Sequence, residues 1–205
     1  AYAMAGGLLV GALVLGYTLG WAFMGALVFY LVLTTSYTLL LKNVIIIDVM
    51  AIAFGFVVRA VAGAFAVDVT FSNWLVVCTL FLALFLAPNK RRSELVLLED
   101  GATEHRAVLV HYSTQYLDAL IYMMAAGAML TYTIYTCDAA VVERFGTDKL
   151  YLTLPFVVYG LFRYLFLVHQ QTGGGDPGRT LLRDWPTGLT VVLWGLSCIA
   201  IIYLA

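Results

Sequence analysis

Long apolar stretches separated by short polar segments are the feature that most constrains this chain. A helix needs about 20 apolar residues to cross a bilayer, and seven stretches meet that length approximately: 2–19, 21–40, 44–67, 71–88, 115–136, 150–169 and 186–204. Only 11% of the residues are charged and 63% are hydrophobic, whereas a soluble domain has about 25% charged residues. A water-soluble globular fold is therefore excluded.

Each of these stretches is expected to be a helix, because lipid offers no hydrogen-bond partner to a free backbone group. We therefore predict an all-α fold, a polytopic transmembrane helix bundle with about seven helices. We expect residues 1–205 to form a single transmembrane domain, with a cytoplasmic loop lobe at about 89–114. A run rich in glycine and alanine at 125–128 favours close packing between helices.

Basic residues are distributed unequally over the six connecting loops. Loops one, three and five hold only Arg144 and Lys149. Loops two, four and six hold the larger set, which comprises Lys42, Lys90, Arg91, Arg92, Arg106, Arg179 and Arg183. By the positive-inside rule, the second group of loops is cytoplasmic. The chain is thus predicted to be a multi-pass protein of the cell (plasma) membrane. A net charge of −1 without a basic tail gives no indication of nucleic-acid binding.

The most concentrated charge is the segment Asn89-Lys90-Arg91-Arg92-Ser93-Glu94, directly after an apolar span. Three adjacent cations at a membrane surface can bind a phosphate or a diphosphate. The alternative is an anchor whose side chains extend to anionic lipid headgroups. If the helix continues through this segment, Glu94 is one turn from Lys90 and is expected to orient it.

The third span carries two charges on one helical stripe. Asp48 and Arg59 are eleven residues apart, about 16 Å along a helix, and Ile52 and Gly55 lie between them on the same face. A charge as deep in the membrane as Arg59 must face a polar cavity or a partner. An ion pair with another helix is one interpretation. A polar cavity open to the cytoplasm is favoured, because Gly55 leaves room beside the arginine.

Several other polar residues lie on the predicted cytoplasmic side. Tyr37 and Lys42 flank the second loop, where each is either a site residue or an ordinary interface residue. Arg163 lies nearly two turns from the end of its span and either binds a ligand or extends to the surface. The sixth loop holds Asp176 and Arg183 beside a run of glycines, which permits a close approach of the backbone to a ligand but also suits a flexible linker.

Taken together, the unusual polar residues gather at one predicted membrane face. This distribution favours an enzyme that joins an anionic cytoplasmic substrate to a lipid held between helices. A transporter or channel would need polar residues at both faces, and the outer half of this chain has few. The three histidines, His105, His111 and His169, share no helical face and predict no metal site.

Five segments together resemble the UbiA prenyltransferase superfamily, and its decaprenyl-phosphate phosphoribosyltransferase branch most closely. Those segments are Tyr37-Thr-Leu-Leu-Leu-Lys42 with Asp48, Phe54-Gly-Phe-Val-Val-Arg59-Ala-Val-Ala-Gly63, Leu84-Phe-Leu-Ala-Pro-Asn-Lys90-Arg-Arg-Ser-Glu-Leu95, Phe162-Arg163-Tyr164, and Asp176-Pro177 with Leu182-Arg183-Asp184. The resemblance extends over almost the whole chain.

The resemblance implies nine transmembrane helices, of which the seven spans here correspond to the third through the ninth. It also implies Mg²⁺ as a cofactor, bound mainly by an Asn-Asp-x-x-Asp motif after the second helix. That motif is absent from these residues, so the metal ligands are not identified in this chain. We expect the chain to be the C-terminal portion of such an enzyme, lacking the first two helices and inactive alone.

The resemblance further implies transfer of 5-phosphoribose from phosphoribosyl diphosphate to a polyprenyl (decaprenyl) phosphate lipid, with release of pyrophosphate, for cell-wall arabinan precursors. Lys42, Asp48, Lys90 and Arg91 are then the candidate catalytic residues. The candidate substrate-binding residues are Tyr37, Arg59, Arg92, Glu94, Arg163, Asp176 and Arg183. Two alternatives are a UbiA-type prenyltransferase acting on an aromatic acceptor and a non-enzymatic membrane transporter. A homo-oligomer is compatible with the sequence, which does not determine the oligomeric state.

Overall fold

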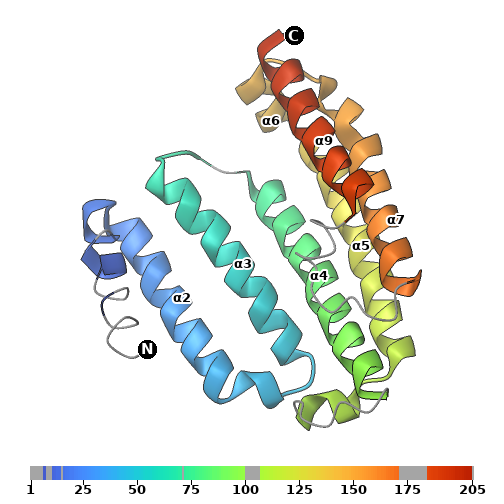
Figure 1. Cartoon of the computed structure of the whole chain (residues 1–205). Helices are drawn as coiled ribbons and strands as arrows, with labels where there is room; N and C mark the ends of the chain where they lie inside the picture. The colour runs from blue at the N-terminus through green and yellow to red at the C-terminus, as the bar shows by residue number, and fades with distance from the viewer. Residues whose placement is uncertain are drawn as a thin grey trace. The chain divides into compact units, whose positions relative to one another are not determined.

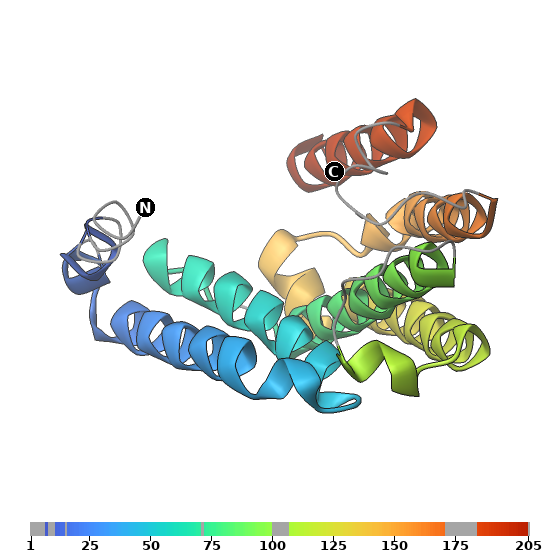
Figure 2. The ribbon, with the colours of Figure 1, turned by 60° about the horizontal axis from the view of Figure 1, so that its bottom comes forward.

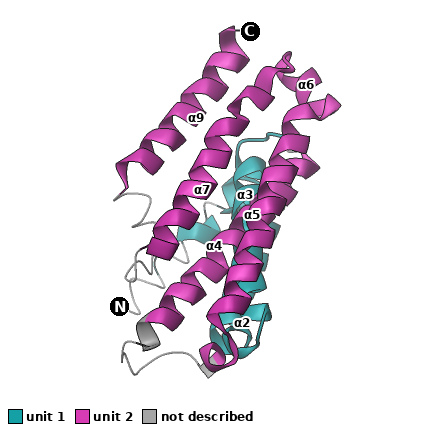
Figure 3. Cartoon of the chain, turned by 90° about the vertical axis from the view of Figure 1, so that its right-hand side faces the viewer, with its two compact units in different colours: residues 1–71 teal, residues 72–205 magenta. Residues whose placement is uncertain are grey.

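The computed structural model describes residues 7, 11–14, 16–70, 72–99, 107–170 and 184–204, and every regular element within these ranges is a helix (Figure 1). This confirms the predicted all-α class. The chain divides into two compact units, Ala1–Phe71 and Ser72–Ala205, which Figure 3 colours separately. The expectation of a single domain over the whole chain stays a prediction.

Unit 1 is built around two neighbouring helices, α2 (Trp21–Leu39) and α3 (Ile47–Ala66), joined through the short 3-10 helix η1 (Leu41–Asn43). The turn into α3 is strained. Ile46 has φ 69° and ψ −44°, a backbone conformation that is unfavourable for a β-branched side chain. Such strain persists only where the surrounding structure enforces it; this turn lies two residues before Asp48, directly before the start of α3 at Ile47.

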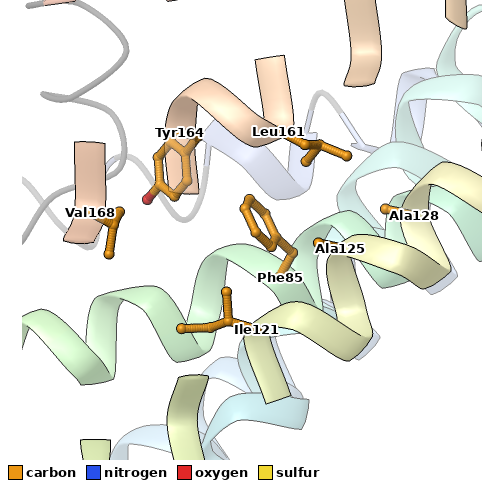
Figure 4. Packing of buried hydrophobic residues seen from close by; sticks show 7 residues of the cluster. All are labelled: Phe85, Ile121, Ala125, Ala128, Leu161, Tyr164 and Val168. Atoms are coloured by element: carbon orange, nitrogen blue, oxygen red, sulfur yellow. The ribbon is translucent and has the colours of Figure 1, made fainter. Parts of the chain in front are cut away.

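Unit 2 contains α4 (Asn73–Glu99), α5 (Thr114–Cys137), α6 (Ala139–Phe145), α7 (Leu154–Gln170) and α9 (Trp185–Leu204), with 3-10 helices η2 (Ala107–His111) and η3 (Lys149–Thr153). Helices α4 and α5 lie side by side in both Figure 1 and Figure 2. The largest buried apolar cluster joins α4, α5 and α7, and Figure 4 shows its members: Phe85, Ile121, Ala125, Ala128, Leu161, Tyr164 and Val168.

Small residues allow α4 and α5 to approach closely, as the alanine- and glycine-rich run at 125–128 predicts. Ala125 and Ala128 are each 3% exposed. A Cβ added at Gly127 would lie 2.4 Å from Cδ1 of Phe81 on α4, which is well inside van der Waals contact. The aromatic ring therefore occupies the space that only glycine leaves at this position.

Six helices in the described ranges are long and apolar enough to cross a membrane: Trp21–Leu39, Ile47–Ala66, Asn73–Val96, Thr114–Cys137, Lys149–Gln170 and Trp185–Leu204. They correspond to six of the seven predicted spans and confirm a polytopic membrane protein. The first predicted span, 2–19, falls largely outside the described residues.

The predicted lobe at 89–114 differs from expectation at its beginning, because α4 continues past Pro88 to Glu99. Proline in a helix removes one backbone donor. Two side chains add hydrogen bonds to backbone carbonyls there: Asn89 Nδ2 donates to Phe85 O at 2.7 Å, and Ser93 Oγ donates to Asn89 O at 3.1 Å. The basic segment is consequently the last part of a helix.

Candidate anion-binding site

Arg59 on α3 is an exposed residue whose contacts are aromatic and hydroxylic. Its Nη1 donates to the hydroxyl of Tyr30 on α2 at 3.2 Å, and its guanidinium carbon lies 4.3 Å from the centroid of the Phe56 ring. Among the described residues, no carboxylate forms an ion pair with it. The aromatic contacts orient the cation without neutralising its charge.

A pocket of about 180 Å³ lies between α2 and α3 in unit 1, and Arg59 lines it. Its lining also includes Tyr37, Ile52 and Gly55, so the predicted stripe does border a cavity. A Cβ at Gly55 would lie 3.7 Å from the Tyr30 ring, which is ordinary contact distance. The lining thus combines a cation, tyrosine hydroxyls and an apolar wall, a composition that suits an anionic group attached to an apolar tail.

Two other predicted residues of unit 1 lie outside this lining. Asp48 belongs to the same stripe but is fully buried, with 0% of its surface exposed. Lys42 lies in η1 and is half-buried. Both are near the connection between α2 and α3, which the charge distribution predicts to be cytoplasmic.

The three adjacent cations of α4 point in different directions, because consecutive residues of a helix are about 100° apart. Lys90 is exposed, whereas Arg91 is 1% exposed and its Nη1 donates to Glu94 Oε2 at 2.7 Å. The expectation that Glu94 orients Lys90 is thus replaced by an i,i+3 pair with Arg91. The segment does not present one uniform basic patch.

Arg92 belongs to a polar cluster that the sequence analysis missed. Its Nε donates to Asp118 Oδ1 on α5 at 2.5 Å, and Asp118 Oδ1 lies 3.3 Å from Nε2 of His169 on α7. The hydroxyl of Tyr122 lies 3.0 Å from the same histidine nitrogen. An aspartate inside a membrane span is itself a signal of function, and it could have directed attention to this cluster.

Arg163 on α7 forms a two-point ion pair with Asp184, the residue directly before α9. Its Nε donates to Oδ2 at 3.1 Å, and its Nη2 donates to Oδ1 at 2.8 Å. The backbone N–H of Thr187 also donates to Asp184 Oδ2, at 3.0 Å, so the carboxylate caps the N-terminus of α9. The Arg163 guanidinium holds the pKa of Asp184 well below its usual range, although burial acts in the opposite direction. These contacts give Arg163 a structural ion pair, which neither of its two interpretations included, and its predicted role in ligand binding stays a prediction.

Some predicted features of the site involve residues that the structure does not describe, or distances between the two units. Asp176 and Arg183 lie outside the described residues. Arg59 belongs to unit 1 and the α4 cations to unit 2, so their convergence on one chamber stays a prediction. In the described ranges no group of three or more His, Cys, Asp or Glu side chains could hold a metal ion. These residues therefore do not fit a magnesium site by themselves.

Comparison with known proteins adds independent information. No protein-family model matches the chain. It is 26% identical over 207 residues to a protein of Mycolicibacterium smegmatis, covering 95% of the chain and 63% of that relative. It is 28% identical to one of Corynebacterium glutamicum, covering 85% of the chain and 52% of the relative. It is 25% identical to one of Mycobacterium tuberculosis, covering 82% of the chain and 54% of the relative.

All three relatives are named decaprenyl-phosphate phosphoribosyltransferase. The chain spans between 52% and 63% of the length of these curated relatives. The comparisons confirm the resemblance that the sequence motifs indicate: over most of its own length, this chain is similar to decaprenyl-phosphate phosphoribosyltransferases.

Proposed function

We propose that the protein containing this chain transfers 5-phosphoribose from phosphoribosyl diphosphate to a polyprenyl phosphate and releases pyrophosphate. The observation that carries the proposal is the similarity, over 95% of the chain, to a decaprenyl-phosphate phosphoribosyltransferase. The pocket beside Arg59 and the basic end of α4 support it, because both substrates are anions and one of them carries a long apolar tail.

The reaction exchanges one bond at the anomeric carbon of the ribose. The bond between C1 and the pyrophosphate oxygen breaks, and a bond forms between C1 and an oxygen of the lipid phosphate. That phosphate is already an anionic nucleophile, so no general base is required. The protein must mainly stabilise the charge that develops on the leaving pyrophosphate, which is electrostatic catalysis. Lys90, which is exposed, and Arg92, which is 16% exposed, are our candidates for this role; Arg91 is enclosed and paired with Glu94.

Arg59 is our candidate for binding the lipid phosphate. A cation on a membrane-spanning helix is costly unless it meets a polar partner, and the hydroxyl of Tyr30 is the only hydrogen-bond partner found for Arg59 in the described ranges. A phosphate group in the adjacent pocket would supply the missing negative charge. The polyprenyl tail would then extend along the apolar surfaces of α2 and α3. Asp48, a candidate catalytic residue, is fully buried, so we assign it no direct contact with the donor.

The setting of the reaction is part of the proposal. We place the protein in the UbiA superfamily and in the plasma membrane, with its active site on the cytoplasmic side, where the basic loops are predicted to lie. Mg²⁺ is the cofactor that the resemblance implies, and its ligands are not identified in this chain. The lipid product would serve as a precursor of cell-wall arabinan.

The test is transfer of radioactive label by membranes that contain the full-length protein. Phosphoribosyl diphosphate labelled in the ribose is incubated with decaprenyl phosphate, and the lipid is extracted. We expect label in the lipid fraction. Arg59→Gln should lower the rate roughly 10- to 100-fold, the loss expected for one charged hydrogen bond. Arg144→Gln is the matched control, because this exposed arginine lies on α6, in a loop that the charge distribution does not place on the cytoplasmic side. Label that stays entirely in the aqueous phase of the wild-type reaction would refute the assignment.

The alternatives make different predictions in the same membranes. An aromatic prenyltransferase would transfer a prenyl group to an aromatic acceptor and leave the ribose label in water. A transporter needs polar groups free to line a path to the other face. In unit 2 the hydroxyls of Tyr132 and Thr153 lie 2.6 Å apart, and Trp194 Nε1 donates to Tyr132 at 2.8 Å. Because these groups hydrogen-bond to one another, they are not free to line a polar path through unit 2, which weighs against a transporter.

A further inference from the structure

Three helices of unit 2 contribute charged side chains to one contact cluster. Arg92 comes from α4, Asp118 from α5 and His169 from the last turn of α7. The Asp118 carboxylate lies between the two others, 2.5 Å from Arg92 Nε and 3.3 Å from His169 Nε2. Because all three belong to one compact unit, the geometry does not depend on the placement of unit 1.

The carboxylate holds only part of the Arg92 guanidinium. A guanidinium has five N–H groups. Nε donates to Asp118, and Nη1 makes a long contact of 3.5 Å with Val168 O. In the described part of the chain, the remaining N–H groups of Arg92 have no protein acceptor within hydrogen-bond distance, and the side chain is 16% exposed. Arg92 is thus fixed in direction but retains donors for an anion, whereas Arg91 is fully enclosed.

His169 is in turn fixed from the other side. Its Nδ1 lies 2.8 Å from Leu165 O, and a carbonyl can only accept, so Nδ1 carries the hydrogen. In the neutral ring, Nε2 then accepts from the hydroxyl of Tyr122, 3.0 Å away. In the protonated ring, Nε2 also carries a hydrogen and donates to Asp118 Oδ1, 3.3 Å away. The histidine ring also stacks on Tyr122, with 5.8 Å between centroids. The carboxylate held between Arg92 and the protonated ring has little freedom to rotate.

We propose that Asp118, supported by His169, is a positioning residue that orients Arg92 toward the phosphate groups of phosphoribosyl diphosphate. The inference rests on the proposed function, since it names the ligand that Arg92 receives. A free arginine side chain populates many rotamers, and binding a ligand restricts them at a cost in entropy. The carboxylate fixes the side chain before the donor binds.

The first measurement is steady-state kinetics of the full-length protein with Asp118→Asn, which keeps the shape of the side chain and removes its charge. We expect the KM for phosphoribosyl diphosphate to rise about tenfold, with kcat and the KM for decaprenyl phosphate changed less than about twofold. Asp138→Asn is the matched control: Asp138 caps α6 through Ala140 N at 3.0 Å, and asparagine caps equally well. A role limited to stability would move both KM values together or neither.

A double-mutant cycle separates positioning from an independent contribution. If Asp118 acts through Arg92, the Asp118→Asn/Arg92→Gln double variant binds the donor no more weakly than Arg92→Gln alone. Additive losses of affinity would contradict the proposal. His169→Gln is a second variant for the case in which Asp118→Asn fails to fold, and it should raise the same KM about threefold by loosening the carboxylate.

Binding of inorganic pyrophosphate, measured by titration calorimetry on the same proteins, keeps the two proposals distinguishable. If the wild type forms no labelled lipid but Asp118→Asn binds pyrophosphate about tenfold more weakly than the wild type, the proposed function fails and the positioning role stands. If labelled lipid forms and neither Asp118→Asn nor His169→Gln changes pyrophosphate affinity or the donor KM, the positioning role is overturned. If the wild type neither forms labelled lipid nor binds pyrophosphate, both fail.

Discussion

Replacing Gly127 by alanine tests the packing that holds the two longest helices of unit 2 together. The added Cβ would lie 2.4 Å from Cδ1, 2.5 Å from Cε1 and 3.0 Å from Cγ of the Phe81 ring. Cγ lies at the base of the ring, so a small rotation of the side chain cannot relieve the overlap. Overpacking of this kind costs about 1–3 kcal/mol.

A matched control removes the effect of helix propensity, because alanine favours a helix over glycine by about 1 kcal/mol. Gly160 on α7 is suitable: a Cβ there would lie 4.0 Å from its nearest neighbour, Cγ2 of Thr190. Both substitutions gain the same propensity, so the difference between them isolates the clash. Gly127→Ala should be about 1–3 kcal/mol less stable than Gly160→Ala.

The assay is thermal unfolding of the purified protein in detergent, with the two variants compared side by side. Replacing the Phe81 ring by the smaller leucine side chain, in a Gly127→Ala/Phe81→Leu double variant, should recover part of the lost stability, since the two sites are in direct contact. Equal stability of Gly127→Ala and Gly160→Ala would refute the reasoning, and with it the close approach of α4 and α5.

Three further predictions follow from contacts in unit 2. Because the pKa of Asp184 is depressed in the folded protein, the pair with Arg163 stabilises the protein at pH values above the ordinary aspartate pKa, about 3.9, and that stability is lost as the pH falls toward the folded-state value. The protection of α9 amides from hydrogen exchange, taken relative to the intrinsic rate at each pH, should therefore fall in acid in the wild type, and much less so in Asp184→Asn. Trp194→Phe removes the donor to the Tyr132 hydroxyl and should lower the unfolding free energy by about 0.5–1.5 kcal/mol in a denaturation series. Asn89 Oδ1 is buried without a hydrogen-bond partner in the described ranges, whereas Asn89 Nδ2 donates to Phe85 O. Asn89→Leu removes both the unsatisfied oxygen and this hydrogen bond, so the free energy of unfolding should change by less than about 1 kcal/mol; a larger loss would show that the hydrogen bond to Phe85 O outweighs the buried oxygen.

The parts of the site that lie on one helix could be predicted from the sequence. The stripe Ile52, Gly55 and Arg59 follows from helical periodicity alone, and these three residues line the pocket of unit 1. The spans could be predicted for a similar reason, because their length and composition are set locally by the bilayer.

Contacts between helices could not be predicted in the same way. Asp118 and His169 are separated by 51 positions in the sequence, and the packing of α5 against α7 brings them together. The ion pair of Arg91 with Glu94 was also missed, because both i,i+3 and i,i+4 pairs are compatible with a continuing helix. Which one forms depends on the burial of Arg91, which is a tertiary property.

The most direct measurement of the central claim uses a donor with two labels, one in the ribose and one in the β-phosphate of the diphosphate. After reaction of the full-length protein with decaprenyl phosphate, the account predicts the ribose label in the lipid extract and the β-phosphate label in water, as pyrophosphate. Recovery of both labels in the lipid, or of both in water, would contradict phosphoribosyl transfer.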